Sequence, residues 1–208
     1  MSPAPEPGRI VLLNGVPRAG KSSIAAAIQD RFDGVWMNLG KDRFMAMTPA
    51  RYHPGIGLRP GGERPDLEPL VATLYQGLYQ AIAAHSRLGV NVVADVSHHE
   101  DGYSRPLGIL PACAALLQGL PAWFVGVRCP IEIVMQRRAA TWGVGYAQDG
   151  SIPAPVLRFQ AMVHDPGIYD LEVDTGEATP EACADAIRAH LDHGPPPTAL
   201  RRLLEIAA

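Results

Sequence analysis

The sequence has few cysteines and no excess of basic residues. Its three cysteines, Cys113, Cys129 and Cys183, are odd in number and far apart, which argues against a disulfide framework and lacks the paired spacing of a zinc site. Aspartate and glutamate (21) outnumber lysine and arginine (18), whereas proteins that wrap nucleic acid usually carry a basic excess or stripe. We therefore expect reduced, structural thiols and a small soluble molecule, rather than nucleic acid, as the partner.

Long apolar runs and targeting signals are also missing. No stretch approaches the ~18 apolar residues that span a bilayer, and the first residues, MSPAPEPG, lack the basic start and apolar centre of a signal peptide. We expect a cytoplasmic protein with no membrane partner. At 208 residues, 47% of them hydrophobic, the chain is long enough to bury a central sheet in one α/β domain.

What the chain does contain is an alternation of short apolar runs with helical patterns. The apolar runs predict strands at residues 9–14, 34–40, 90–96, 121–129 and 169–175. The helical patterns predict helices at residues 21–32, 67–89, 109–119, 130–143 and 179–191. This alternation indicates parallel strands joined by right-handed crossovers, and so a three-layer α/β fold with a five-stranded parallel sheet.

Two segments rich in glycine and proline, residues 52–65 and 143–155, interrupt the pattern. We expect the first to be a long surface loop that serves as a substrate-binding element or a lid. The core of the single domain (1–208) is expected at residues 9–192. A proline hinge and a short amphipathic helix follow at residues 194–208; we expect this tail to pack or fray, with a homodimer contact as the alternative.

The strongest motif is GVPRAGKS, residues 15–22, which satisfies G-x-x-x-x-G-K-[ST] between an expected strand and an expected helix. Its glycines let backbone amides converge on a phosphate at a helix N-terminus. Lys21 would reach the β- and γ-phosphates and Ser22 the magnesium ion. A turn that only joins the two elements is the alternative. The candidate nucleotide-binding residues are Gly15, Val16, Pro17, Arg18, Ala19, Gly20, Lys21, Ser22 and Ser23.

Two aspartates follow other expected strands. Asp95 ends the run NVVAD, where an acid is costly unless it meets a cation or donors, and we expect it to bind Mg²⁺ directly or through water. Asp42 closes the preceding strand at the same carboxyl edge of the sheet, in position to take a proton from an acceptor hydroxyl. The alternatives are a helix cap or turn for Asp95 and a turn aspartate beside Lys41 and Arg43 for Asp42.

Several arginines could neutralise phosphate charge. Arg137 and Arg138 lie just before the break at Gly143, where a mobile lid could bring a guanidinium onto the transferring phosphoryl group. Arg128, which ends VGVR, and Arg18 within the glycine-rich loop are the other candidates. The residues alone do not rank them.

Histidines are candidates for metal ligands or for a general base. His98 and His99 are adjacent, so they lack the i, i+4 spacing that brings two imidazoles together on a helix. We keep these two as candidate acceptor-pocket residues, because loops after such strands bind substrate.

With these pieces in order, the chain resembles the chloramphenicol phosphotransferase-like family of P-loop kinases. The landmarks are IVLLNGVPRAGKSSIA, LGKDRFMAMTP, the acid after VVAD, FVGVRCP and VHDPGIYDLEVDT, which together span most of residues 9–192. The first is common to P-loop proteins, whereas VGVRC combined with H-x4-YDLEVDT is more specific. The resemblance implies ATP-dependent phosphorylation of an antibiotic hydroxyl, with Asp42 as general base, Arg137 as the lid-side arginine and residues 175–180 beside the adenine.

The sequence departs from the family in two places. After Arg138 the expected lid reads AATWGVGYAQDGSIPAP, without the further arginines that the family usually has, so Arg138 or Arg158 would have to compensate. The loop after Asp95, VSHHEDGYS, is more polar than we expect around the aromatic ring of chloramphenicol. A kinase of a nucleoside or sugar derivative and a nucleotide-binding regulator without phosphoryl transfer therefore remain alternatives.

Overall fold

The computed structural model describes residues 5–52, 64–100, 103–143 and 145–207. Its sheet has five parallel strands in the order β2-β3-β1-β4-β5. The strands are β1 (Ile10–Asn14), β2 (Trp36–Asn38), β3 (Asn91–Val96), β4 (Ala122–Arg128) and β5 (Leu171–Asp174). The parallel five-stranded α/β fold expected from the sequence is thereby confirmed.

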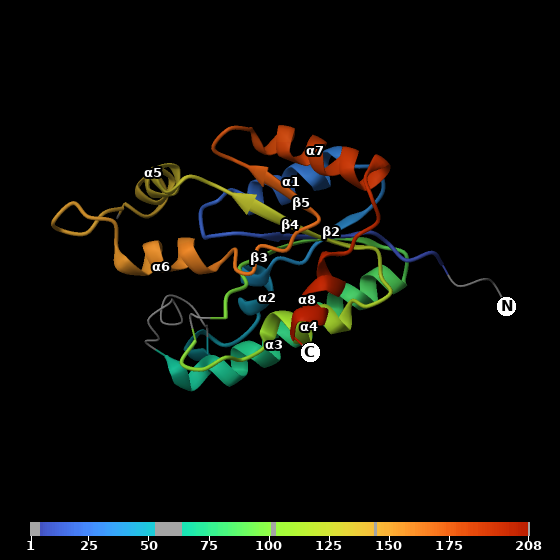
Figure 1. Cartoon of the computed structure of the whole chain (residues 1–208), viewed down its shortest axis with the longest axis horizontal. Coiled ribbons are helices and arrows are strands. Elements are labelled where there is room, and N and C mark those ends of the chain that lie inside the picture. The colour runs from blue at the N-terminus through green and yellow to red at the C-terminus, as the bar shows by residue number, and fades with distance from the viewer. Residues whose placement is uncertain (1–4, 53–63, 101–102, 144, 208) are drawn as a thin grey trace.

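Helices cover both faces of the sheet (Figure 1). One layer holds α1 (Lys21–Arg31) and α7 (Pro180–His193), and the opposite layer holds α3 (Glu68–Arg87), α4 (Ile109–Leu116) and α8 (Ala199–Ala207). Three further helices lie toward the carboxyl ends of the strands: α2 (Lys41–Met45), α5 (Ile131–Trp142) and α6 (Ala154–Met162). The chain therefore has its irregular segments at the edge of the sheet where ligands of such folds bind.

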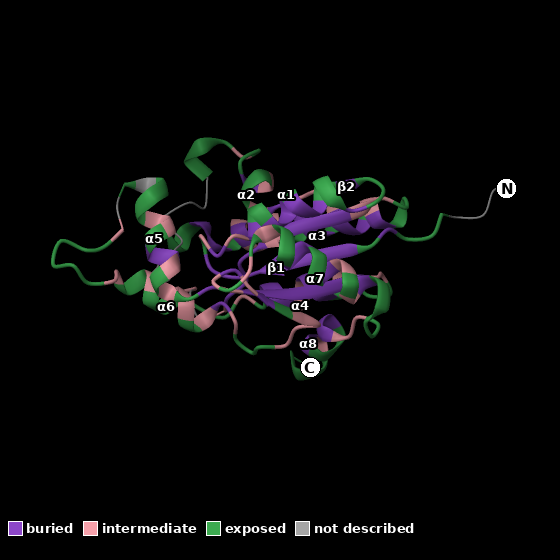
Figure 2. Ribbon diagram, turned by 90° about the horizontal axis from the view of Figure 1, so that it is seen from above, coloured by how far each residue is buried: buried purple, intermediate pink, exposed green. Residues whose placement is uncertain are grey.

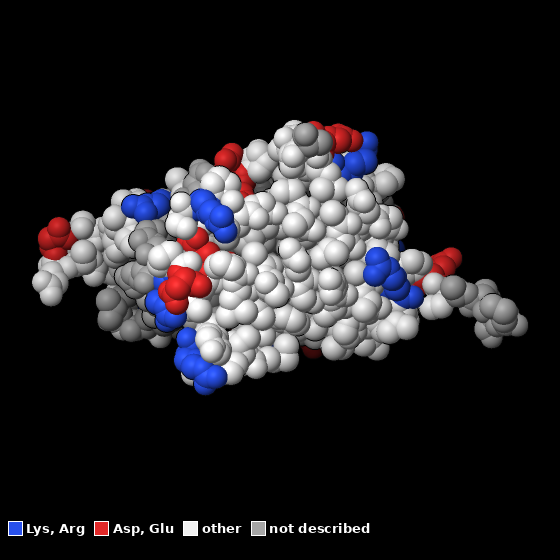
Figure 3. Space-filling view, turned by 90° about the horizontal axis from the view of Figure 1, so that it is seen from below, with Lys and Arg blue, Asp and Glu red and all other residues white. Residues whose placement is uncertain are grey.

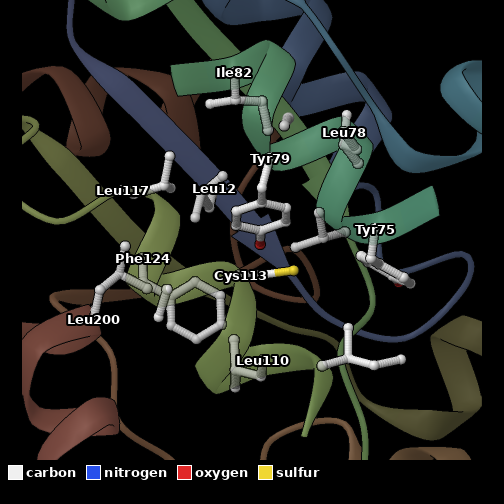
Figure 4. Packing of buried hydrophobic residues seen from close by; sticks show 14 of the residues in the cluster. Leu12, Tyr75, Leu78, Tyr79, Ile82, Leu110, Cys113, Leu117, Phe124 and Leu200 are labelled. Carbon is white, nitrogen blue, oxygen red and sulfur yellow. The ribbon is translucent and has the colours of Figure 1, made fainter. Parts of the chain in front are cut away.

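The core consists of two apolar clusters, because successive side chains of a strand point to opposite faces of the sheet. In β1, Ile10 and Leu12 join the cluster under α3, α4 and α8, which contains the buried Tyr79 (Figure 4). Val11 and Leu13 join the cluster under α1 and α7. Figure 2 shows this central sheet as almost continuously buried, as expected for strands covered on both faces.

Several predicted boundaries differ from the structure, two of them in the segments at the carboxyl edge of the sheet. Strand β2 ends at Asn38, and Lys41 and Asp42 begin the short helix α2 instead of closing the strand. Asp42 is also two strands from β1, because β3 lies between them. The Gly/Pro-rich break 143–155 ends earlier than expected, since α6 begins at Ala154 directly after Pro153.

The predicted surface loop 52–65 lies mostly outside the described residues. Its two ends are visible as 3₁₀ turns at Ala50–Tyr52 and Pro65–Leu67. Among the helices of the described residues, none has the length and apolarity needed to cross a membrane.

The C-terminal helix α8 packs on the domain. Leu200 and Leu203 of α8 are buried in the cluster shared with α4. The carboxylate of Asp170 accepts hydrogen bonds from the amides of Thr198 (2.7 Å) and Ala199 (2.9 Å), at the start of the helix, which satisfies amides that the helix itself leaves without partners.

On the face seen in Figure 3, charged side chains are scattered around a largely uncharged centre.

Candidate active site

The glycine-rich loop between β1 and α1 forms a tight turn whose shape depends on two residues with positive φ. Gly20, directly before α1, has φ 90°, and Arg18 has φ 71°. Glycine adopts this conformation without steric cost, whereas it is uncommon for a residue with a side chain. The loop thus places the N-terminus of α1 toward solvent at the carboxyl edge of the sheet, where a helix end attracts an anion.

Lys21 is buried at the centre of this loop. Its Nζ donates hydrogen bonds to the carbonyl oxygens of Gly15 and Val16, both at 2.8 Å. Burial, and then the charge of Lys41, lower the pKa of Lys21 to about 8, against the opposing effects of Asp95 and Asp42. The ammonium group is therefore held over its own loop, in an environment that disfavours its charge until an anion arrives.

Ser22 and Asp95 form the second part of the site. The hydroxyl of Ser22 donates to Oδ2 of Asp95 at 2.5 Å. On the other side of this carboxylate lies Gly40: a Cβ atom built there would come within 1.8 Å of Asp95 Oδ1. Asp95 is therefore fixed between the first turn of α1 and the start of α2, and only glycine leaves room for it at position 40.

These residues line one open pocket of about 480 Å³ at the carboxyl edge of the sheet. Its lining consists of Pro17, Arg18, Gly20, Lys21, Ser22, Ser23, Lys41, Asp42, Asp95, Ser97, Arg137, Thr141, Thr175 and Pro180. Three of the predicted nucleotide-binding residues are absent from this lining. Gly15, Val16 and Ala19 form the underside of the loop, with Val16 and Ala19 buried in the core.

Asp42 lines the pocket from helix α2. Its side chain is 91% exposed, and Oδ1 lies 3.4 Å from Nζ of Lys41. As part of α2 rather than of a strand, Asp42 enters the site through the same turn that packs Gly40 against Asp95. The pocket thus brings an exposed carboxylate to the same space as the phosphate loop.

Arg137 is held inside the pocket by the segment after β5. Its Nη1 and Nη2 atoms donate to the hydroxyl (3.0 Å) and the carbonyl oxygen (2.8 Å) of Thr175. The same hydroxyl donates to the carbonyl oxygen of Ala19 at 2.6 Å. Thr175 therefore connects the phosphate loop, the end of β5 and the guanidinium of α5.

The other candidate arginines behave differently. Arg128 forms a two-fold ion pair with Glu172, at 2.9 and 3.0 Å, and does not line the pocket. The predicted compensating residues, Arg138 and Arg158, are also outside the lining. Of the arginines in the described residues, Arg18 and Arg137 are those that the structure brings to the phosphate loop.

The histidines considered as acceptor-pocket residues lie beneath the surface. His98 is buried, its Nε2 lies 2.7 Å from the hydroxyl of Tyr79, and burial lowers its pKa to about 3. His99 is buried as well and stacks on Tyr103, with ring centroids 4.7 Å apart. Neither lines the pocket, so His98 is a neutral group of the core and not a general base near pH 7.

Sequence reasoning missed Ser97, Thr141 and Lys41 as pocket residues. Ser97 donates to the carbonyl oxygen of Gly15 at 2.9 Å, beside the bond from Lys21. The signal for Ser97 was its place two residues after Asp95, at the carboxyl end of the neighbouring strand. Lys41 had no comparable signal, because the helix that aims it into the pocket is only five residues long.

The donor atoms near the loop suit magnesium. The hydroxyl of Ser22 and the carboxylate of Asp95 are oxygen ligands, which Mg²⁺ prefers, and the ion usually keeps water and phosphate oxygens as its remaining ligands. Within the part of the chain that the structure describes, no group of three or more His, Cys, Asp or Glu residues forms a metal site by itself. A cation here would therefore be shared with a bound phosphate.

Replacing Gly40 by alanine should disrupt this cation site. The new Cβ atom would collide with Asp95 Oδ1 and displace the carboxylate from the position in which it accepts the hydrogen bond of Ser22. We expect Mg²⁺ to enhance nucleoside triphosphate binding ~10- to 100-fold less than in the unchanged protein, measured by titration with and without Mg²⁺. Gly77→Ala is the matched control, because its Cβ would make an ordinary 3.5 Å contact with Phe44; an unchanged Mg²⁺ effect in Gly40→Ala would contradict this role.

The lowered pKa of Lys21 predicts a pH dependence of phosphate binding. Below a pH of about 8 the ammonium is charged before binding, whereas above it each binding event must take up a proton. Triphosphate affinity should be flat from about pH 7 and then fall by up to about tenfold per pH unit above the pKa. Calorimetric titration would show this fall, and Lys21→Arg, whose guanidinium stays charged, should abolish it.

Known proteins resemble this chain in sequence and in fold. Two Mycobacterium tuberculosis proteins, from strains CDC 1551 / Oshkosh and H37Rv, are each 28% identical to it over 98% of this chain and 90% of their own length; their names assign them provisionally as O-phosphotransferases. The M. tuberculosis APS kinase in complex with AMPPNP and APS has a TM-score of 0.62 at 15% identity, covering 90% of this chain and 99% of that one.

A sugar kinase from a Janibacter species has a TM-score of 0.60 at 21% identity, covering 89% of this chain and 95% of that one. At such identities these likenesses concern the fold, which is that of P-loop kinases. The family described as chloramphenicol phosphotransferase-like protein matches residues 8–192. Because that match takes in every strand, the phosphate loop and the pocket, the chain belongs to the chloramphenicol phosphotransferase-like family.

Proposed function

We propose that this protein transfers the γ-phosphoryl group of ATP to a hydroxyl of a small molecule, with chloramphenicol or a related antibiotic as the first candidate acceptor. The observation that carries the proposal is that a phosphate loop and an exposed carboxylate, Asp42, line the same pocket. Phosphoryl transfer needs little beyond positioning, charge neutralisation and a group that orients the nucleophile. The family and the provisional names of the M. tuberculosis relatives support the same reaction class.

Each of these pocket residues would have its own role in the reaction. Backbone amides of the loop and Lys21 hold the β- and γ-phosphates, and Ser22 and Asp95 hold Mg²⁺. When bound, Mg²⁺ neutralises charge on the phosphate oxygens. The acceptor oxygen attacks the γ-phosphorus, the bond from that phosphorus to the β–γ bridging oxygen breaks, and the acceptor proton passes to Asp42. The products are ADP and a phosphate monoester.

Arg137 would act from the nucleotide side. Its guanidinium is fixed by Thr175 directly beside Gly20, where an added Cβ atom would lie 3.4 Å from Nη1. This position suits neutralisation of phosphate charge from α5 without a large movement of the helix. Residues 175–180, of which Thr175 and Pro180 line the pocket, would border the adenine.

One alternative acceptor class follows from the pocket's chemistry. At its acceptor end the lining is polar and includes Lys41, Asp42 and Ser97, and the histidines expected around the acceptor are buried elsewhere. Such a surface favours an acceptor with several hydroxyl groups, such as a sugar or nucleoside derivative, over a mainly aromatic one. A regulator without phosphoryl transfer has no use for the Asp42 carboxylate beside the phosphate loop.

A screen of hydroxylated antibiotics and metabolites, headed by chloramphenicol, tests the reaction. We expect Mg²⁺-dependent release of ADP that rises with one acceptor, and a phosphate adduct of that acceptor in the mass spectrum. Lys21→Ala should lose this activity while keeping its circular dichroism spectrum, because the charge on the transferred group is no longer balanced. Phosphorylated acceptor formed by Lys21→Ala would refute the role of the loop, and ADP release without adduct would point to simple hydrolysis.

Asp42→Asn separates proton transfer from binding. Loss of a general base typically costs ~10²–10⁴-fold in rate, so we expect kcat to fall by this amount, whereas nucleotide affinity stays within about twofold because Asp42 contacts solvent and Lys41. Asp33→Asn, an exposed aspartate outside the pocket, should leave both values unchanged. Near-normal kcat in Asp42→Asn would assign Asp42 to the turn alone.

A further inference from the structure

The pocket is lined by both positively and negatively charged side chains. Among the described lining residues, the cations are Arg18, Lys21, Lys41 and Arg137, and the carboxylates are Asp42 and Asp95. Beyond Arg137, the segment of α5 and α6 brings no arginine to the pocket, since Arg138 and Arg158 lie outside the lining. Lys41 is the lining cation that comes from α2, whereas Arg18, Lys21 and Arg137 come from the phosphate loop, α1 and α5.

The start of α2 fixes where Lys41 lies. Gly40 packs so closely against Asp95 that a Cβ atom would fall 1.8 Å from the carboxylate, and its amide donates to the side chain of Asn38 at 3.3 Å. Lys41 follows directly as the first residue of the helix, with its side chain 28% exposed and Nζ 3.4 Å from Asp42. Its ammonium group is therefore next to the Asp42 carboxylate, which is proposed to orient the acceptor, and it lines the same pocket as Ser22 and Asp95.

Lys41 and Lys21 face a common space. Both side chains line the pocket, Lys21 buried at the start of α1 and Lys41 partly exposed at the start of α2. Two ammonium groups that repel each other across a pocket are stabilised when an anion lies between them. The pocket that both lysines line also contains the carboxylate of Asp42.

We propose that Lys41 binds the terminal phosphate of the nucleoside triphosphate from the acceptor side and supplies the second cation for phosphoryl transfer. This inference rests on the proposed function and names a residue that the family resemblance does not assign. In the transition state, charge spreads over the oxygens of the transferred group, so Lys41 would stabilise transfer as well as the bound triphosphate. A diphosphate lacks the group that Lys41 contacts.

Binding measurements test Lys41 without any knowledge of the acceptor. The dissociation constants of ADP and of a non-hydrolysable ATP analogue are measured for the unchanged protein, Lys41→Met, Lys41→Arg and Arg43→Met. We expect Lys41→Met to weaken the analogue about tenfold, or ~1.4 kcal/mol, and ADP less than twofold. Lys41→Arg should restore most of the preference for the triphosphate, because it keeps the charge.

Arg43→Met is the matched control, since Arg43 lies on the same short helix, is exposed and is outside the pocket lining. It removes one positive charge two residues after Lys41. Both dissociation constants should stay within about twofold of those of the unchanged protein, as expected for screened surface charges. Circular dichroism and thermal melting of each variant confirm folding, which the partly exposed Lys41 side chain should not affect. If the melting temperature of Lys41→Met were lower than that of the unchanged protein, Lys41→Gln would be used in its place.

The outcomes separate this inference from the proposed function. Equal weakening of ADP and the analogue by Lys41→Met, or no weakening of either, would overturn the role of Lys41 and leave the kinase proposal standing. Selective weakening of the analogue supports Lys41 even if no tested acceptor is phosphorylated. An unchanged protein that binds neither nucleotide would overturn both.

Discussion

The carboxamide of Asn14 is buried at the end of β1, directly before the phosphate loop, and three chain segments meet on it. Its amide donates to the carbonyl oxygen of Val163 (2.8 Å) and the hydroxyl of Tyr169 (2.9 Å), and its oxygen accepts the backbone amide of His98 (2.8 Å). A buried amide is costly unless such bonds are made. The end of α6, the approach to β5 and the loop after β3 are thus tied to the strand that carries the phosphate loop.

A separate set of acids holds the chain after β3. Glu68, at the start of α3, accepts hydrogen bonds from the amide (2.7 Å) and hydroxyl (2.5 Å) of Ser104, and Glu100 accepts the amide of Gly108 at the start of α4 (3.0 Å). These bonds connect the segment after β3 to the start of α3 and to the start of α4. The phosphate loop is therefore positioned by the sheet, whereas this segment is positioned by helix ends, and such connecting segments vary more readily among relatives.

The sheet, its flanking helices and the phosphate loop were predictable because each leaves a periodic or motif signal in consecutive residues. The run NVVAD predicts both β3 and the position of Asp95, and the structure agrees with the strand. Helix α2 was missed because five residues contain too little periodicity and follow a glycine that normally indicates a turn. Contacts between distant segments, such as Arg128 with Glu172 or Thr175 with Arg137, have no local signal at all.

Lys21 already has hydrogen-bond partners in its own loop when no phosphate is bound. In the free protein its ammonium donates to the carbonyl oxygens of Gly15 and Val16, and a bound phosphate would compete with these carbonyls for the N–H donors of Lys21. The Gly15 carbonyl would still hold the hydroxyl of Ser97 at 2.9 Å, so turning Lys21 toward a phosphate does not leave that oxygen buried and unpaired. Because Ser97 directly follows β3, the strand that carries Asp95 also positions this hydrogen bond to the phosphate loop.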